Sequence, residues 1–169
     1  MLTSTAFADN AKIPCAHVAP YCGGQQQSPP LAWTAGPEGT QSYAIVMENN
    51  IPELHWILYD IPADVTSLAA NITRLTFTPN PPAGSRQTRP PANFGNDEVG
   101  YHGPCPNPME GGGNASRAYT FTVYALSVDK LADVNDATPI ETILQKLQAV
   151  DLATATLTGT QNASVGACN

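Results

Sequence analysis

Two stretches, Ser42-Tyr-Ala-Ile-Val-Met47 and His55-Trp-Ile-Leu-Tyr-Asp-Ile61, decide the fold class of this chain. Both are rich in β-branched and aromatic residues, which favour strands, and both end at turn-forming residues. We therefore predict two central β-strands. The segment between them, residues 48–54, is short and polar, so it is expected to place polar groups at one end of the sheet.

Two later segments predict further strands. Residues 118–126 alternate apolar residues with threonine, which predicts a strand with Tyr119, Phe121 and Val123 on one face. Residues 153–160 alternate in the same way and predict the last strand of the fold. Four strands with this spacing indicate a mainly β protein.

One helix is predicted, over about residues 139–150. Thr138 is a candidate N-cap, Pro139 suits the first turn, and Glu141 has the capping-box position. Four apolar residues at helical spacing predict a stripe that covers the sheet. They are Ile140, Ile143, Leu144 and Leu147.

Two regions have little periodicity. Proline and glycine interrupt residues 1–30, so we predict an irregular segment that needs external anchoring. Residues 80–113 are similarly interrupted and predict a long loop region. Long loops within compact domains often carry function, which makes the second region a candidate for the functional site.

Size and charge limit the possible functions. The chain has 169 residues, which predicts a single domain over residues 1–169. With 14 acidic and 7 basic residues its formal charge is -7, so nucleic acid is not an expected partner. A small anionic ligand remains compatible with this charge, because a local cluster of backbone amides outweighs distant, screened charges.

The four cysteines indicate an oxidising compartment. Their number is even and no C-x-x-C pair occurs among them, which favours two disulfides over a zinc site. We therefore expect a periplasmic or secreted protein. The sequence has no apolar run of about 20 residues that would span a bilayer, and residues 1–4 do not resemble the start of a signal peptide.

Several short motifs occur in a characteristic order over about residues 6–161. They are Ser28-Pro-Pro-Leu-Ala-Trp33, Gly36-Pro-Glu-Gly-Thr-Gln-Ser-Tyr-Ala44, His55-Trp56, Asp60-Ile-Pro62, Asn93-Phe-Gly95, Gly100-Tyr-His-Gly-Pro-Cys-Pro106 and Leu157-Thr-Gly-Thr160. In this order they resemble the motifs of the phosphatidylethanolamine-binding protein family, in its bacterial, Raf kinase inhibitor-like branch.

The resemblance implies a β-sandwich with a few peripheral helices. It also implies a small pocket that holds a phosphate, a carboxylate or a phospholipid headgroup, formed by a DPDxP-type loop, the strand that begins with His-Trp and a GxHGP-type loop. Members of the family are mostly non-enzymatic, and some modulate a kinase or protease partner. A non-enzymatic binding protein without a cofactor is therefore the expected function.

The family's pocket positions map onto residues of this chain. The resemblance implies ligand contacts for His55, Tyr101, the loop residues His102, Gly103 and Pro104, and Glu48, Asn50 and Pro52 of the DPDxP-type loop. Where the family has two aspartates, this chain has Glu48 and Asn50. An asparagine lacks the negative charge that would keep a neighbouring histidine protonated, so the pocket chemistry is expected to differ.

The resemblance also implies a disulfide pairing. Cys22 and Cys105 match positions that are bridged in some exported relatives, which leaves Cys15 to pair with Cys168.

Two alternatives compete with the binding function. One is a small-ester or phosphoester hydrolase in which Glu48 is the general base and His55 or His102 the acid; no known nucleophile motif accompanies it. The other is an inhibitor that acts through its surface, with a decayed pocket. A metal site is not expected, since His17, His55 and His102 lack ligand spacing.

Overall fold

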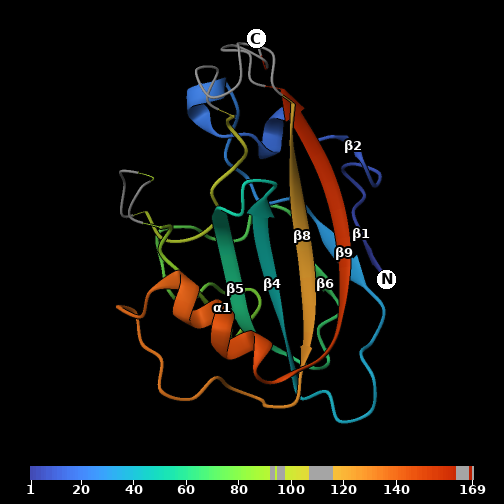
Figure 1. Ribbon diagram of the computed structural model, residues 1–169, viewed down its shortest axis with the longest axis vertical. Coiled ribbons are helices and arrows are strands. Elements are labelled where there is room, and N and C mark those ends of the chain that lie inside the picture. Colours follow the sequence, from blue (N-terminus) through green and yellow to red (C-terminus); the bar gives the residue numbers. More distant parts are fainter. Residues whose placement is uncertain (92–93, 95–97, 107–115, 163–167, 169) are drawn as a thin grey trace.

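The computed structural model describes residues 1–91, 94, 98–106, 116–162 and 168. The described residues form two β-sheets and one α-helix (Figure 1). The larger sheet has the strand order β2-β9-β8-β4-β5-β7, and the smaller has the order β1-β3-β6. The long strands of the larger sheet are β4 (Ser42–Asn49), β5 (Leu54–Pro62), β8 (Ser116–Leu126) and β9 (Asp151–Asn162).

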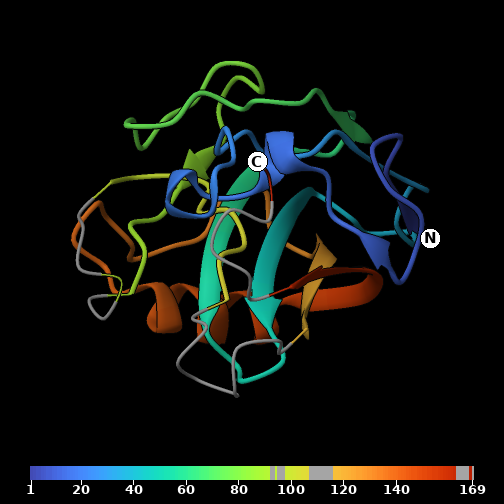
Figure 2. The same cartoon turned by 90° about the horizontal axis from the view of Figure 1, so that it is seen from above.

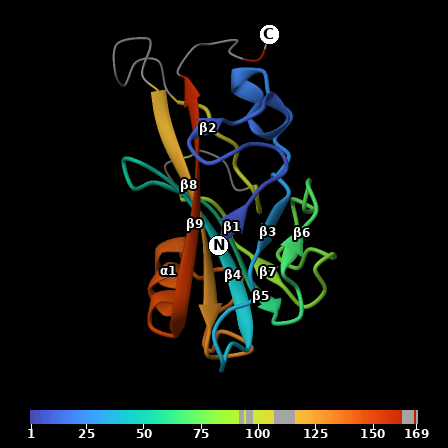
Figure 3. The same ribbon diagram turned by 90° about the vertical axis from the view of Figure 1, so that its right-hand side faces the viewer.

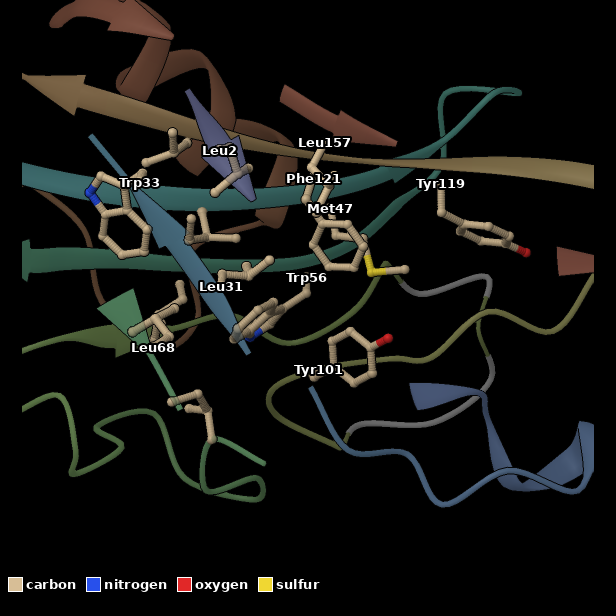
Figure 4. Close-up of a cluster of buried hydrophobic side chains, with 14 of the residues drawn as sticks. Leu2, Leu31, Trp33, Met47, Trp56, Leu68, Tyr101, Tyr119, Phe121 and Leu157 are labelled. Carbon is tan, nitrogen blue, oxygen red and sulfur yellow. The ribbon is translucent and has the colours of Figure 1, made fainter. Parts of the chain in front are cut away.

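The large sheet is covered on both faces. Helix α1 (Ile140–Gln148) lies on one face and the small sheet lies on the other (Figures 2 and 3). Because successive strand residues point to opposite faces, alternate residues enter two separate cores. We call the core between the sheets the inter-sheet core (Figure 4), and the other the helix-side core.

The four long strands confirm the predicted ones. On β8, Tyr119, Phe121 and Val123 all enter the inter-sheet core, as their alternation predicts. The mainly β, sandwich-type fold with a peripheral helix is likewise confirmed. Strand β4 pairs with β5 and β8, both antiparallel, and extends to Asn49, beyond the predicted end at Met47.

The helix differs from its prediction at the N-terminus. Pro139 is the N-cap and makes no side-chain capping hydrogen bond. The hydroxyl of Thr138 instead accepts a hydrogen bond from the backbone N–H of Asn135, 2.9 Å away. The predicted capping box is therefore wrong, because this hydroxyl closes the preceding turn. The apolar stripe is confirmed, with Ile140, Ile143 and Leu147 buried and Leu144 partly buried.

The remaining elements are short, and most of them lie in or next to the two regions predicted to be irregular. The first 33 residues contain β1 (Leu2–Thr3), β2 (Ala11–Lys12), β3 (Leu31–Trp33) and two short 3-10 turns, Cys15–His17 and Pro20–Cys22. Strands β6 (Ser67–Leu68) and β7 (Arg86–Gln87) complete the sheets. Strands of two or three residues are too short to produce a periodic pattern, which explains why the sequence does not reveal them.

Both disulfides form with the pairing that the family resemblance implies. Cys15 is bonded to Cys168 and Cys22 to Cys105. The two 3-10 turns of the first region carry Cys15 and Cys22, so this poorly periodic region has the external anchoring that it needs. Among the described residues, no helix is long and apolar enough to cross a bilayer.

Candidate functional site

A β-bulge at the start of β5 places His55. Met47 of β4 pairs with Trp56 and Glu48 pairs with Leu54, so His55 is the extra residue of the bulge. Bulges re-aim side chains, and here the imidazole lies against Tyr119, a residue of the inter-sheet core, with ring centroids 5.1 Å apart. His55 is thus buried near the start of β5.

Asn49, the last residue of β4, organises the loop that leads to His55. Its Oδ1 accepts hydrogen bonds from the backbone N–H groups of Ile51 and Glu53, each 3.0 Å away. Its Nδ2 donates to Glu53 Oε2 at 2.7 Å and lies 3.3 Å from His55 Nε2. Asn49 therefore holds both the loop and the imidazole.

These contacts determine the tautomer of His55. Its Nδ1 lies 3.2 Å from the backbone oxygen of His102, which accepts hydrogen bonds only, so Nδ1 carries the proton. Because Asn49 donates through Nδ2, Nε2 of His55 is the acceptor. The neutral imidazole consequently offers a lone pair, and no N–H, at Nε2.

Burial keeps His55 neutral. Desolvation lowers its pKa from 6.5 to about 4, while the hydrogen bond to the His102 backbone opposes this shift and the charge of His102 adds to it. Burial also lowers the pKa of His102, with a smaller contribution from the charge of Arg74. Both imidazoles are therefore uncharged at neutral pH.

Phe94 lies between the two histidines. Its ring centroid is 4.9 Å from that of His55, and its ring stacks on that of His102 at 5.7 Å with an interplanar angle of 6°. Phe94 is half-buried. The site thus has an aromatic wall of Phe94 and Tyr119.

The loop from Gly100 to Cys105 forms a second wall and is fixed by the first region of the chain. The backbone N–H of Gly103 lies 3.3 Å from Gln26 Oε1, and Pro104 O accepts a hydrogen bond from Ala19 N at 3.1 Å. A Cβ atom on Gly103 would lie 2.6 Å from the backbone oxygen of His17, so this position requires glycine.

Tyr101 has a structural position in the same loop. It is fully buried, its hydroxyl donates to the backbone oxygen of His17 at 2.7 Å, and its ring packs edge-on against Trp56 at 5.5 Å. Tyr101 therefore joins this wall to the inter-sheet core. The disulfide between Cys22 and Cys105 holds the end of the loop.

Of the three residues expected from the DPDxP-type loop, Glu48 lies on the opposite face of the sheet from Asn49, and the other two are exposed. Glu48 follows the alternation of β4 onto the face of the helix-side core, opposite to Asn49, and it raises the pKa of Tyr124 on that face, although burial of Tyr124 contributes more. Asn50 and Pro52 are exposed in the loop. The geometry therefore does not bring Glu48 together with His55 or His102 as an acid–base pair.

Sequence reasoning missed several polar residues of the site. Asn49 and Glu53 contact each other, and the charges of Glu53 and Arg117 both act on the hydroxyl of Tyr119. That hydroxyl bonds the backbone of Cys105, and burial raises its pKa. Arg117 is itself buried. Had the predicted strand ended at Asn49 rather than at Met47, the alternation would have identified Asn49. It lies on the same face of β4 as Tyr43, Ile45 and Met47.

A cavity of about 600 Å³ lies elsewhere, beside β6. Its lining includes Asp64, Ser67, Leu68 and Asn80 but no histidine, lysine or arginine. It does not contain the residues that suit an anion, whereas the end of the inter-sheet core combines an imidazole, a guanidinium, hydrogen-bonding amides and aromatic walls.

Comparisons with known proteins agree with this architecture. The family profile described as "Phosphatidylethanolamine-binding protein" matches residues 3–162. The UPF0098 protein YbcL of Escherichia coli is 32% identical over 165 residues, which cover 93% of this chain and 84% of YbcL. A UPF0098 protein of Aquifex aeolicus is 33% identical over 132 residues, 76% of this chain and 68% of that protein.

Two solved structures are also similar. The crystal structure of Escherichia coli YbcL, described as a new member of the mammalian PEBP family, has a TM-score of 0.79 at 29% identity and covers 95% of this chain and 96% of its own. A putative phosphatidylethanolamine-binding protein homolog from Chlamydia trachomatis has a TM-score of 0.73 at 28% identity, with 95% of each chain covered. This chain belongs to the phosphatidylethanolamine-binding protein family.

Proposed function

We propose that this protein is a non-enzymatic binding protein of an oxidising compartment, the periplasm or the exterior, and that it holds a small oxyanion at His55. The ligand is a phosphate or carboxylate group, free or in a phospholipid headgroup. The observation that carries the proposal is the buried, neutral imidazole of His55 at the polar end of an otherwise apolar core.

Binding requires a proton between the ligand and the imidazole. Nε2 of His55 accepts a hydrogen bond from Asn49, and an acceptor facing an anionic oxygen is repelled. A protonated imidazolium, or a ligand that keeps one acidic proton, removes this repulsion and replaces the hydrogen bond from Asn49. Either route predicts proton uptake when a fully ionised phosphoester binds at neutral pH.

One observation favours a second function. Both ring nitrogens of His55 already have hydrogen-bond partners within the protein, as they would in a pocket that no longer binds a ligand. In that case the protein acts through its surface, for example as an inhibitor of a protease or a kinase. The hydrolase alternative has no such support, because Glu48 lies on the other face of the sheet.

Thermal denaturation with added ligand tests the binding function. We expect millimolar phosphate, acetate or phosphoethanolamine to raise the melting temperature of the wild-type protein, since a ligand that binds only the folded state stabilises it. The shift should vanish in His55→Ala. The matched control is Glu48→Gln, which alters a carboxylate at the same end of the sheet but on the other face, and which should keep the full shift.

An unchanged melting temperature with all three ligands would refute the binding function and leave the surface function standing. A shift that persists in His55→Ala would instead refute the role of His55. Hydrolysis of a phosphoester by the wild-type protein that Glu48→Gln abolishes would support the enzyme alternative.

A further inference from the structure

Gln161, near the end of β9, is a buried residue whose side-chain amide has no hydrogen-bond partner among the described residues. Its side chain is 1% exposed. Neither Oε1 nor Nε2 bonds any residue that the structure describes. Each unsatisfied buried polar atom destabilises a protein by about 1–3 kcal/mol, so a glutamine that leaves both unsatisfied is unfavourable for folding alone.

The sheet places this amide at the polar end of the inter-sheet core. Leu157 and Gly159 alternate with Gln161 along β9, and the first of them lies in the inter-sheet core. In the antiparallel pairing of β8 and β9, Gln161 is directly opposite Arg117 and Gly159 is opposite Tyr119. One face therefore carries His55, Asn49, Tyr119, Arg117 and Gln161 across four adjacent strands.

We propose that Gln161 and Arg117 form the part of the site that selects the oxyanion, and that they select one that keeps an acidic proton. This inference rests on the proposed binding function and names its ligand class. A guanidinium only donates hydrogen bonds, whereas the carboxamide offers both a donor group, Nε2 with its two N–H bonds, and an acceptor, Oε1. A monoprotonated phosphate matches this set, because its ionised oxygens accept from Arg117 and Nε2 and its P–OH group donates to Oε1.

The acceptor Oε1 of Gln161 is the atom that discriminates between oxyanions with and without an acidic proton. A phosphate monoester has a second pKa of about 6, so it exchanges a proton near neutral pH and supplies the P–OH group. Sulfate has the same shape but no proton, so it would leave Oε1 unsatisfied and facing an anionic oxygen. Sites built to bond a hydroxyl discriminate strongly against analogues that lack it.

The test compares phosphate with sulfate by calorimetric titration at pH 6. We expect the wild-type protein to bind phosphate at least about tenfold more tightly than sulfate. Gln161→Met keeps the length of the side chain and removes both polar atoms, so the preference should fall to less than about threefold. Asn162→Ala, a substitution at the exposed neighbour, is the matched control and should retain the wild-type ratio.

Stability provides an independent measurement. Without ligand, Gln161→Met should melt about 3 °C or more above the wild type, because two unsatisfied buried atoms are removed. A variant that gains thermal stability and loses the preference for phosphate over sulfate shows that Gln161 serves ligand binding rather than folding. A buried water that satisfies the amide would instead make Gln161→Met less stable and leave the ratio unchanged, and this would overturn the proposal.

The two proposals fail in different ways. Equal affinity for phosphate and sulfate in the wild type, with both lost in His55→Ala, would refute the selective role of Gln161 and keep the binding function. A preference for phosphate that survives in His55→Ala but is lost in Gln161→Met would refute the role of His55 and keep that of Gln161.

Discussion

The two faces of the large sheet use the same strands for opposite purposes. On the face that packs against α1, Ala44, Val46 and Ile57 enter a core made of apolar side chains. On the other face the apolar residues give way, at one end of the sheet, to Asn49 at the end of β4 and His55 at the start of β5, beside further buried polar groups. A shift of one residue along β4, from Glu48 to Asn49, therefore moves a side chain from the helix-side face to the candidate site.

The largest effect is expected on the helix-covered face. Ile143 of α1 is fully buried in the helix-side core, so Ile143→Ala should reduce the free energy of unfolding by about 4 kcal/mol through lost packing and a residual cavity. Urea denaturation measures this loss, and exposed Gln145→Ala is the matched control, with an effect below about 0.5 kcal/mol. Oxyanion affinity of the folded variant should stay unchanged; a large decrease would show that the two faces are not independent.

The second-largest effect is expected on the face that carries His55, and it is a loss of folding stability at low pH. The pKa of His55 is about 4 in the folded protein, below its ordinary value of 6.5, so the unfolded chain binds the proton more readily between these values. The stability that accompanies the neutral imidazole is therefore complete above pH 6.5 and is lost as the pH falls towards 4. Between pH 7 and pH 4.5 this loss is about 2–3 kcal/mol.

Urea denaturation of the wild type and His55→Asn at both pH values isolates this effect. The contribution of His102, whose pKa is also lowered, is present in both proteins and cancels in the comparison. We expect the wild type to lose more stability on acidification than His55→Asn. Equal losses would mean that the folded protein does not hold His55 neutral.

The smallest effect tests the altered loop chemistry. Asn49→Asp places a carboxylate beside Nε2 of His55 and should raise the pKa of His55 by about one unit, equivalent to about 1.4 kcal/mol, because the negative charge favours the imidazolium. An NMR titration of the imidazole measures it. The control Asn50→Asp adds the same charge at the exposed neighbour and should shift this pKa far less, since solvent screens it. Equal shifts would contradict the specific contact of Asn49 with His55.

Residue patterns predicted the strands and the helix well, because elements of eight or more residues carry enough alternation or helical spacing to identify them. They did not predict β1, β2 or β7, which have two residues each and pair with strands far away in the sequence. The capping box at Thr138 failed for a local reason, since its hydroxyl bonds Asn135. The preference of threonine for helix N-caps does not reveal when a nearby backbone N–H competes for its hydroxyl.

The candidate site was predicted in part. The motifs predict His55 and the loop from Gly100 to Cys105 as site residues, and His55 does contact this loop. Alignment with the DPDxP-type loop predicts Glu48 and Asn50, whereas Asn49 is the residue that contacts His55. The difference arises from the pleat of β4 and the bulge at His55, which together decide which side chains meet. A pairing register of this kind depends on the neighbouring strand, so one strand's own sequence does not determine it.

The central claim is that a buried, neutral His55 receives a small oxyanion together with a proton. Calorimetric titration of phosphoethanolamine at pH 7.5, in two buffers with different ionisation enthalpies, measures the protons taken up on binding. We expect saturable binding with uptake of at least one proton in the wild type, and no binding in His55→Ala. Saturable binding without proton uptake, or with the same affinity and uptake in His55→Ala, would contradict this claim.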